Sequence, residues 1–252
     1  MLRTQRLDEI LAILRQSRYA TVAELSDRLY ASPATIRRDI ALLEKSELLV
    51  KSHGGVALAD GHNRFIELEQ RAEAHRAEKL QIARDAAALV TPGDALFMDA
   101  SSTVITMIPF LRQPNLTVIT NSLRVAERMG QSGARVYTTG GLLLDSSKAF
   151  GGSMAERAVR SFHADKLFFS TAGVSEDGVM SDYSEMEAQL RQVMISCSSQ
   201  QYYLCDSSKY AKSYLFRVES IEHVTHMLSD KPLTFPNGLR AIADFQEMPE
   251  SL

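Results

Sequence analysis

Short apolar runs alternate with helical stretches over most of the chain, and this alternation limits the fold more than any other feature. The apolar runs, each predicted to form a strand, lie at residues 95–99, 116–120, 135–139, 165–170, 202–205 and 223–228. Stretches with helical character begin at about residues 102, 122 and 184. Strand–helix alternation is typical of a parallel sheet with helices on both faces. The sequence therefore predicts a doubly wound, mostly parallel α/β domain.

The composition is that of an ordinary water-soluble protein, and 252 residues suffice for two domains. The sequence has no run of 18 apolar residues, and its N-terminus is charged, so neither a membrane span nor a signal peptide is predicted. Cys197 and Cys205 have no metal-ligand spacing, which indicates a reducing compartment. We therefore expect a cytoplasmic protein with no metal, no cofactor and no contact with a membrane.

Residues 3–45 carry the signals of three short helices in close succession. Apolar residues at helical spacing predict the first over residues 3–16. Thr21 and Glu24 form a capping box, in which each side chain pairs with a backbone N–H that the helix leaves unpaired, and they start the second helix. Ser32 is a good N-cap for the third helix. Two short helices joined by so tight a turn are typical of a helix-turn-helix.

The third helix has one apolar stripe, and its basic residues lie off that stripe. Arg37 and Arg38 can each donate to guanine O6 and N7 or to a phosphate, and the sequence leaves open which does which. Apolar runs at residues 48–50 and 56–58 flank paired glycines, which predicts a hairpin, the wing of a winged helix. The residues predicted to bind DNA are Ser32, Thr35, Arg37, Arg38, Lys45, Lys51, His53 and Gly54.

We divide the chain at a polar, glycine-containing stretch that follows the wing. Residues 1–58 are predicted to form the winged helix-turn-helix domain, residues 59–76 a linker, and residues 77–252 the α/β domain. Helix-forming residues predict one helix over about residues 67–90, with an apolar seam that docks on the α/β domain.

Polar residues follow the predicted strands. Asp99 closes one strand, and hydroxyl residues 101–103 open the next helix, where free backbone N–H groups suit a phosphate. Residues 120–122 repeat this pattern, the glycine pair at 140–141 allows close approach of a ligand, and Lys209 offers a cation to an anion. Each feature alone is more simply a helix cap or a turn. Together they indicate a ligand site, because ligands of such sheets lie outside the carboxyl ends of the strands.

The residues of both predicted domains resemble the DeoR family of bacterial transcriptional regulators. In the first domain the resemblance is carried by Arg6, Ile10, Leu14, Ser32, Thr35, Ile36, Arg37, Arg38, Asp39 and Ile40. In the second it is carried by residues 99–103, 120–122, 140–141 and 206–209 and by Glu187. The resemblance implies sequence-specific DNA binding and a C-terminal sensor domain whose fold is similar to ribose phosphate isomerases and CoA transferases.

The resemblance further implies that the effector is a phosphorylated sugar or sugar alcohol held through its phosphate. Asp99 would accept hydrogen bonds from sugar hydroxyls, while Glu187 and Lys209 would line the site. Ser101 stands where the family has glycine, and Arg191 where it often has lysine. The predicted effector-binding residues are Asp99, Ser101, Ser102, Thr103, Thr120, Asn121, Ser122, Gly140, Gly141, Gly173, Glu187 and Lys209.

The sequence is compatible with several functions. Surface arginines on a three-helix unit also suit protein docking, but the family resemblance favours a double-stranded DNA operator as the partner. We expect a regulator, a repressor more often than an activator in this family, that acts as a homo-oligomer (dimer or tetramer) because operators present paired half-sites. The alternatives are a sugar-phosphate isomerase with an appended DNA-binding domain, for which no residue stands out as the base, and a constitutive DNA binder without an effector.

Overall fold

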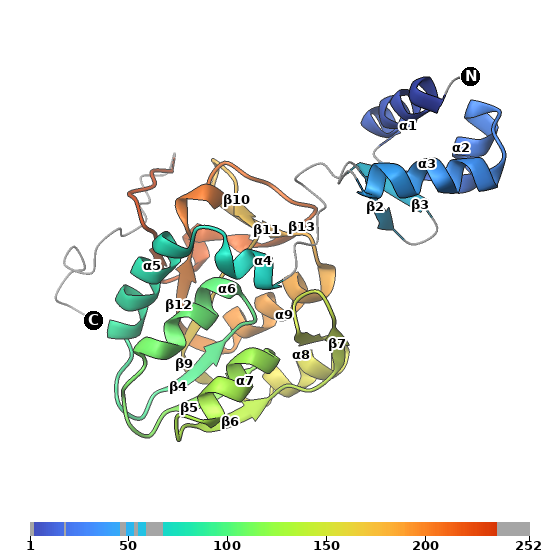
Figure 1. Cartoon of the computed structure of the whole chain (residues 1–252). Coiled ribbons are helices and arrows are strands. Elements are labelled where there is room, and N and C mark those ends of the chain that lie inside the picture. The colour runs from blue at the N-terminus through green and yellow to red at the C-terminus, as the bar shows by residue number, and fades with distance from the viewer. Residues whose placement is uncertain (1–2, 18, 46–48, 53–54, 59–67, 236–252) are drawn as a thin grey trace. The chain divides into compact units, whose positions relative to one another are not determined.

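The structure is a computed structural model that describes residues 3–17, 19–45, 49–52, 55–58 and 68–235. The chain folds as two compact units, Met1–Phe65 and Ile66–Leu252 (Figure 1). Among the described residues, the helices are all too short or too polar to cross a membrane. Both cysteines are free thiols.

The first unit is a three-helix bundle with a small antiparallel sheet. β3 lies in the middle of that sheet and pairs with β1 on one side and β2 on the other. The predicted helices and hairpin are confirmed, while β1 is an addition that no pattern indicated. The elements are α1 (Arg3–Ser17), β1 (Tyr19–Thr21), α2 (Val22–Leu29), α3 (Pro33–Lys45), β2 (Leu49–Ser52) and β3 (Gly55–Leu58).

Side-chain caps set the spacing between α2 and α3. The Glu24 N–H donates to Thr21 Oγ1 at 3.1 Å, and the Thr21 N–H donates to Glu24 Oε2 at 2.7 Å, so the predicted capping box is present. Tyr30 ends α2 in the left-handed region, with φ 49°. The Thr35 N–H donates to Ser32 Oγ at 3.2 Å, which confirms Ser32 as the cap of α3.

The second unit is built on a six-stranded sheet in the order β14-β12-β9-β4-β5-β6, in which every pair is parallel. The strand order reverses between β4 and β9, the sheet's switch point. The last strand, β14, begins only at His226 and is shorter than the predicted run 223–228, because the first residue of that run belongs to the 3₁₀ helix η3 (Ile221–His223). The strands are β4 (Ala95–Met98), β5 (Thr117–Thr120), β6 (Arg135–Thr138), β9 (Ala164–Phe169), β12 (Ser198–Leu204) and β14 (His226–Leu228).

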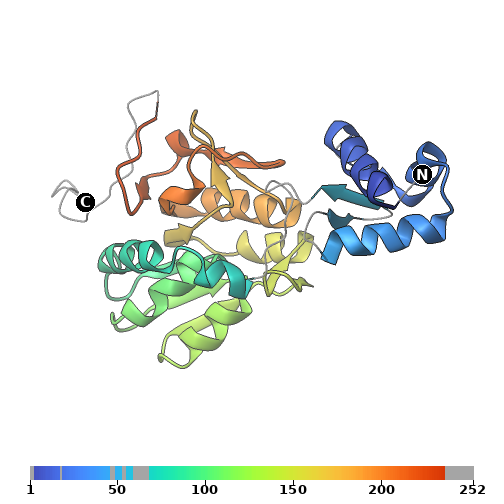
Figure 2. The same cartoon turned by 45° about the horizontal axis from the view of Figure 1, so that its top comes forward.

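Helices cover both faces of this sheet, as predicted (Figure 2). One core joins alternate strand residues such as Met98 and Phe168 to α5, α6 and α7, and the other joins Phe97 and Phe169 to α8 and α9. Alternation along a strand sends neighbouring side chains to opposite faces, which explains the two cores. The helices are α5 (Arg76–Ala88), α6 (Ser102–Met107), α7 (Leu123–Gly130), α8 (Ser153–Val159) and α9 (Glu185–Ser196).

The single helix predicted over residues 67–90 is wrong. The chain forms α4 (Leu68–Glu73) and α5, and His75 between them takes a left-handed conformation with φ 53°. Lys79 Nζ donates to the carbonyl oxygens of Ala74, at 2.7 Å, and Arg71. A buried ammonium that needs acceptors thus favours the break. Leu68 is buried in the core of the second unit, so α4 belongs to that unit although it falls within the predicted linker.

Two small sheets complete the second unit, and the sequence indicated neither. A hairpin joins β7 (Leu142–Leu144) to β8 (Ala149–Gly151). A three-stranded antiparallel sheet joins β10 (Gly173–Val174), β11 (Val179–Asp182) and β13 (Phe216–Ser220). Short 3₁₀ helices lie at η1 (Ile108–Phe110) and η2 (Ser207–Lys209).

Candidate functional site

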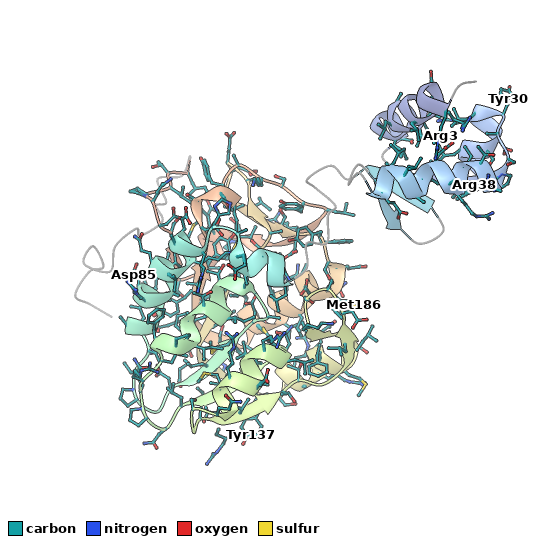
Figure 3. All side chains as sticks on the ribbon, viewed as in Figure 1. Arg3, Tyr30, Arg38, Asp85, Tyr137 and Met186 are labelled. Carbon is teal, nitrogen blue, oxygen red and sulfur yellow. The ribbon has the colours of Figure 1, made fainter. Side chains whose placement is uncertain are left out.

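The α3 helix buries one face and exposes its arginines. Ile36, Ile40 and Leu43 are each at most 4 % exposed and pack in the core of the first unit. Arg37 and Arg38 are exposed, and Figure 3 shows Arg38 extending away from the helix. This arrangement follows from the 3.6-residue period of the helix. It leaves two guanidinium groups available to a nucleic acid.

Asp39 is a structural residue of α3. Its carboxylate is 1 % exposed and accepts from Arg6 Nε at 2.5 Å, with Arg3 Nε 3.5 Å away. The hydrogen bond to Asp39 raises the pKa of Arg6. Because both arginines come from α1, Asp39 ties α1 to α3 and sets the orientation of the exposed arginines.

The other predicted DNA-binding positions divide into three groups. Ser32 Oγ lies 2.9 Å from Thr35 Oγ1, so both hydroxyls are already used at the helix start. Lys45 ends α3 and Lys51 lies in β2, while their side chains are outside the described part of the structure. His53 and Gly54, at the tip of the predicted wing, lie outside the described residues.

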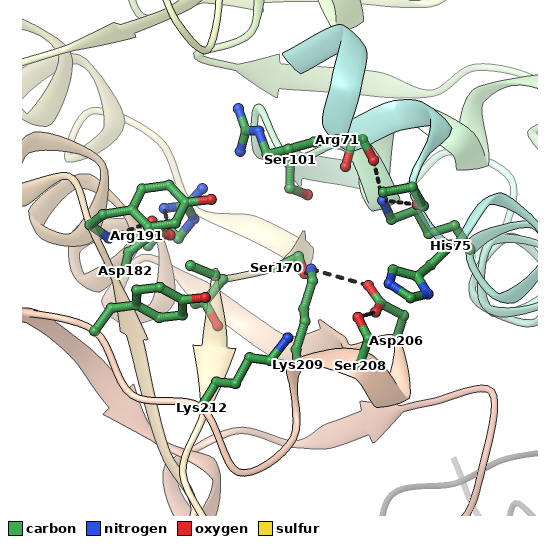
Figure 4. Close-up of a pocket in the computed structure, with 17 residues that line it drawn as sticks. Arg71, His75, Ser101, Ser170, Asp182, Arg191, Asp206, Ser208, Lys209 and Lys212 are labelled. Atoms are coloured by element: carbon green, nitrogen blue, oxygen red, sulfur yellow. Dashed lines mark hydrogen bonds and ion pairs between the residues drawn. The ribbon is translucent and has the colours of Figure 1, made fainter. Parts of the chain in front are cut away.

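A cavity of about 190 Å³ lies in the second unit at the carboxyl ends of β4, β9 and β12 (Figure 4). Ser101 follows β4, Ser170 follows β9, and Asp206 follows β12. These strands include the pair at the switch point of the sheet, where open α/β folds bind ligands. The residues that line the cavity are Arg71, Ala74, His75, Lys79, Ser101, Ser102, Ser170, Thr171, Ala172, Asp182, Tyr183, Arg191, Asp206, Ser208, Lys209, Lys212 and Tyr214.

Arg191 lies in a buried part of the wall. Its Nε donates to Asp99 Oδ2 at 2.7 Å and one terminal nitrogen donates to Asp182 Oδ2 at 2.9 Å, while the side chain is 4 % exposed. Burial disfavours the charged guanidinium, but Asp182 and Asp99 outweigh it, and the pKa of Arg191 is raised. Asp99 also accepts the N–H groups of Ser101, at 2.9 Å, and Ser170, at 3.3 Å. Asp99 thus holds the wall together from behind.

Lys209 and Lys79 bring two ammonium groups to the cavity. Lys209 Nζ donates to Ser170 Oγ at 2.6 Å and lies 3.6 Å from Asp206 Oδ2. Burial tends to raise the pKa of Asp206, but the neighbouring Lys209 outweighs this and the pKa is lowered. Burial lowers the pKa of Lys79 to about 8. Lys79 therefore begins to lose its charge just above neutral pH.

Three of the predicted effector residues, Ser101, Ser102 and Lys209, line the cavity. Ser101, in place of the family glycine, has φ −72° and caps α6 through Val104 N at 3.3 Å, so its Cβ brings no backbone strain. Thr103 is fully buried beside them, and its hydroxyl has no hydrogen-bond partner among the described residues. Asp99 reaches the cavity only through the residues it holds.

The predicted residues on β5 and beyond have structural partners instead. Thr120 Oγ1 donates to the Met98 carbonyl at 2.6 Å, Asn121 Nδ2 donates to the Phe150 carbonyl at 3.1 Å, and Ser122 caps α7. None of these three residues lines the cavity.

The predicted glycines are also outside the lining. A Cβ on Gly141 would lie 2.7 Å from the Gly151 carbonyl oxygen, and one on Gly173 would lie 2.7 Å from the Lys212 carbonyl oxygen. Close packing therefore accounts for both. Gly140 has φ 60° and open space around its Cβ position, which indicates a turn.

Glu187 lies one helical turn before Arg191 on α9 and is 5 % exposed, but it does not line the cavity. In the described part of the chain, neither its Oε1 nor Arg71 Nε in the cavity wall has a hydrogen-bond partner. Buried polar atoms without a partner are costly, so such atoms are where a water molecule or a ligand is expected.

The prediction missed the basic corner between α4 and α5, which contributes Arg71, His75 and Lys79 to the lining. The three lie within nine residues, and their pattern is hidden in a stretch that otherwise reads as one continuous helix. Lys212, after η2, was also missed. No group of three metal-ligating side chains lies together among the described residues.

Two family models match the chain. The DeoR-like helix-turn-helix domain matches residues 6–61, and the DeoR C terminal sensor domain matches residues 74–231. A weaker likeness to ribose 5-phosphate isomerase A of Methanocaldococcus jannaschii, with a TM-score of 0.41 and 16% identity, covers 54% of this chain and 55% of that one. A likeness at that level carries no functional argument.

Curated relatives match nearly the full chain. The HTH-type transcriptional regulator YulB of Bacillus subtilis is 36% identical, over 97% of this chain and 95% of its own length. The transcriptional repressor AccR of Agrobacterium fabrum is 31% identical, over 97% and 93%. The lactose phosphotransferase system repressor of Staphylococcus epidermidis is 32% identical, over 89% and 91%. With a helix-turn-helix domain in the first unit and a sensor domain in the second, this chain belongs to the DeoR family of DNA-binding transcriptional regulators.

Proposed function

We propose that the protein is a repressor of carbohydrate-metabolism genes, and that a phosphorylated sugar or sugar alcohol bound in the second unit controls its affinity for a double-stranded DNA operator. The observation that carries this proposal is the cavity at the switch point, because cations from three separate chain segments face it. Arg71 and Lys79 come from the α4–α5 corner, Arg191 from α9, and Lys209 from η2.

The cation set suits a phosphate better than a neutral sugar. Arg191 is already paired with two carboxylates, and Lys209 has Asp206 beside it. Among the described residues, Arg71 Nε has no hydrogen-bond partner and no interaction of the Lys212 ammonium is seen. Those two groups, with the hydroxyls of Ser101 and Ser102, provide the hydrogen-bond donors that a phosphate needs.

The control follows from a shift between two states of the protein. An effector that binds more tightly to the state with low operator affinity increases the population of that state, and the ratio of its two affinities sets the largest possible change in the equilibrium constant. The α4–α5 corner contributes four lining residues. Among the described residues, this corner is the part of the second unit that comes first in the chain, directly after the first unit. That placement supports a route from the effector to the DNA-binding unit.

The protein is proposed to lack isomerase activity. Proton abstraction from a sugar needs a carboxylate within reach of a substrate C–H. Asp182, a carboxylate of the cavity wall, is held by Arg191, and Asp206 lies beside Lys209. Turnover of sugar phosphates by the purified protein is the contrasting measurement, and any multiple-turnover interconversion would favour the enzyme.

A thermal-shift screen against sugar phosphates and their unphosphorylated counterparts tests the ligand class. We expect a phosphorylated compound to raise the melting temperature and its sugar alone to leave it unchanged, because a ligand of the native state stabilises that state. No shift with any phosphorylated member would contradict the proposal.

The DNA-binding half is tested with a duplex that the protein selects from a random pool. Arg37→Ala or Arg38→Ala should weaken binding by about 1–3 kcal/mol if the arginine reads a base. Ala34→Ser, an exposed change on the same helix, is the matched control. Unchanged affinity in both arginine variants would remove α3 as the reading helix.

A further inference from the structure

An exposed apolar surface lies on the second unit at the β7–β8 hairpin, and none of its residues lines the cavity. It consists of Leu142, Leu143, Met154 and Met186, which are 58%, 43%, 62% and 38% exposed, and we call it the hairpin patch. Leu142 pairs with Gly151, where a Cβ would lie 3.3 Å from Met186 Cβ. Figure 3 shows Met186 at the surface beside the hairpin.

Each face of the hairpin carries an exposed leucine on β7, although Ala149 and Gly151 of β8 are buried. Leu142 and Leu143 are neighbours in β7 and therefore point to opposite faces, yet each is exposed. The outer edge of β8 is used, since the Phe150 N–H donates to the Asn121 carbonyl at 2.7 Å. The outer edge of β7 pairs with no other strand in the described part of the chain. An exposed apolar strand with an open edge is available for pairing with another chain.

The position of α4 beside the hairpin indicates a second copy of the chain as that partner. α4 starts beside this hairpin, because the Leu68 N–H donates to the Ser146 carbonyl at 3.1 Å in the turn between β7 and β8. A contact between two copies at the hairpin would therefore bring the two α4 starts close to one axis. Proteins of the helix-turn-helix class read two half-sites about 34–36 Å apart with two copies of the motif. Each chain has one such motif in its first unit.

We infer that the hairpin patch is the two-fold contact of a homodimer. A two-fold axis places the same surface on both sides of the contact, so Leu142 and Leu143 of one copy meet those of the other. When the axis is perpendicular to β7, the strand runs antiparallel to its own copy, and the open edge of β7 can then continue the sheet. The choice of a second copy as occupant rests on the DNA-reading function, while the effector plays no part in it.

The solution mass of the full chain tests the contact. Sedimentation at about 20 µM should give wild type the mass of two 28.0-kDa chains or a multiple of it. The double variant Leu142→Asp/Leu143→Asp should have half that mass or less, because it buries four charges in a symmetric contact. Leu215→Asp, at a 72% exposed leucine outside the patch, is the control and should keep the wild-type mass. A monomeric wild type, or a double variant with the wild-type mass, would overturn the inference.

Cross-linking decides the case in which the double variant fails to fold. Leu142→Cys treated with a short bis-maleimide should give a covalent dimer, while wild type, which carries only Cys197 and Cys205, should give little. A variant that yields no more dimer than wild type would overturn the contact. The thermal shift with a sugar phosphate, measured on the same variants, reports effector binding separately, so its loss or retention cannot be confused with loss of the dimer.

Discussion

The two sides of the carboxyl edge of the main sheet use similar residues for different purposes. On the side of β4, β9 and β12, the hydroxyls of Ser101 and Ser170 face a cavity together with Lys209. On the side of β5, Thr120 and Asn121 are bonded to neighbouring backbone carbonyls and do not line this cavity. The difference is set by what lies above the strand ends. Charged segments surround the first side, whereas the β7–β8 hairpin covers the second.

The largest effect on stability is expected at Arg191, which pairs with two buried carboxylates at the cavity wall. Arg191→Met leaves Asp99 and Asp182 buried without their partner, so we expect a loss of about 3–5 kcal/mol of unfolding free energy. Burial raises the pKa of a carboxylate that has lost its partner, and protonation relieves the cost, so the loss should shrink as the pH falls from 7 to 5. Urea unfolding of wild type and variant at pH 7 and pH 5 measures both effects. An equal loss at the two pH values would mean that buried charge is not the cause.

The next largest effect, on effector affinity, distinguishes residues that bind the effector from residues that only stabilise the fold. Lys209→Gln removes the ammonium that faces the cavity, and we expect affinity for a phosphorylated effector to fall about 10- to 100-fold, the range for loss of one charge-assisted hydrogen bond. Calorimetric titration with the compound that gives the largest thermal shift provides the number. Lys231→Gln, an exposed lysine elsewhere in the unit, is the control. If the variant binds the effector with wild-type affinity, the effector site does not lie at the carboxyl ends of β4, β9 and β12.

The opposite side should give the reverse result. Thr120→Val removes a hydroxyl that donates to the Met98 carbonyl and accepts the Ser122 N–H at 3.0 Å, leaving two buried groups unpaired. We expect about 1–3 kcal/mol of lost stability and an effector affinity within about twofold of wild type. Chemical denaturation and calorimetry on the same sample check both. A large loss of affinity at full stability would erase the distinction between the two sides.

The smallest effect concerns pH. Burial lowers the pKa of Lys79 to about 8, and an anionic ligand favours its charged form. Binding is then coupled to proton uptake, so effector affinity should fall a few-fold, about the effect of one partly lost charge, as the pH rises from 7 to 9. Lys79→Arg, which stays charged, should flatten this part of the profile. The same decline in both proteins would assign the titration to another group.

Much of the fold could be predicted because each element carries its own local signal. The capping box at Thr21, the cap at Ser32 and the strand–helix alternation all depend on residues close in sequence, and the structure confirms them. The hairpin β7–β8 and the break at His75 were missed. The hairpin lacks an alternating pattern, and the break depends on where the buried Lys79 finds its acceptors.

The site could be predicted only in part, for a related reason. Sequence indicates that a polar residue follows a strand, but not whether another segment covers that strand end. Ser122 and Ser101 both cap helices, and of the two only Ser101 also faces the cavity. The family resemblance supplied Glu187, which lies beside the wall rather than in it. The basic α4–α5 corner carries no strand-end signal and becomes visible only through the fold.

Operator binding measured with and without effector tests the central claim most directly. A selected duplex is titrated with wild type and with Lys209→Gln, in the absence and presence of the best sugar phosphate from the thermal-shift screen. We expect the ligand to weaken operator binding by wild type at least about tenfold, or 1.4 kcal/mol, and to change binding by the variant less than about twofold. Operator affinity that no sugar phosphate alters, or that changes equally in both proteins, would contradict control through this cavity.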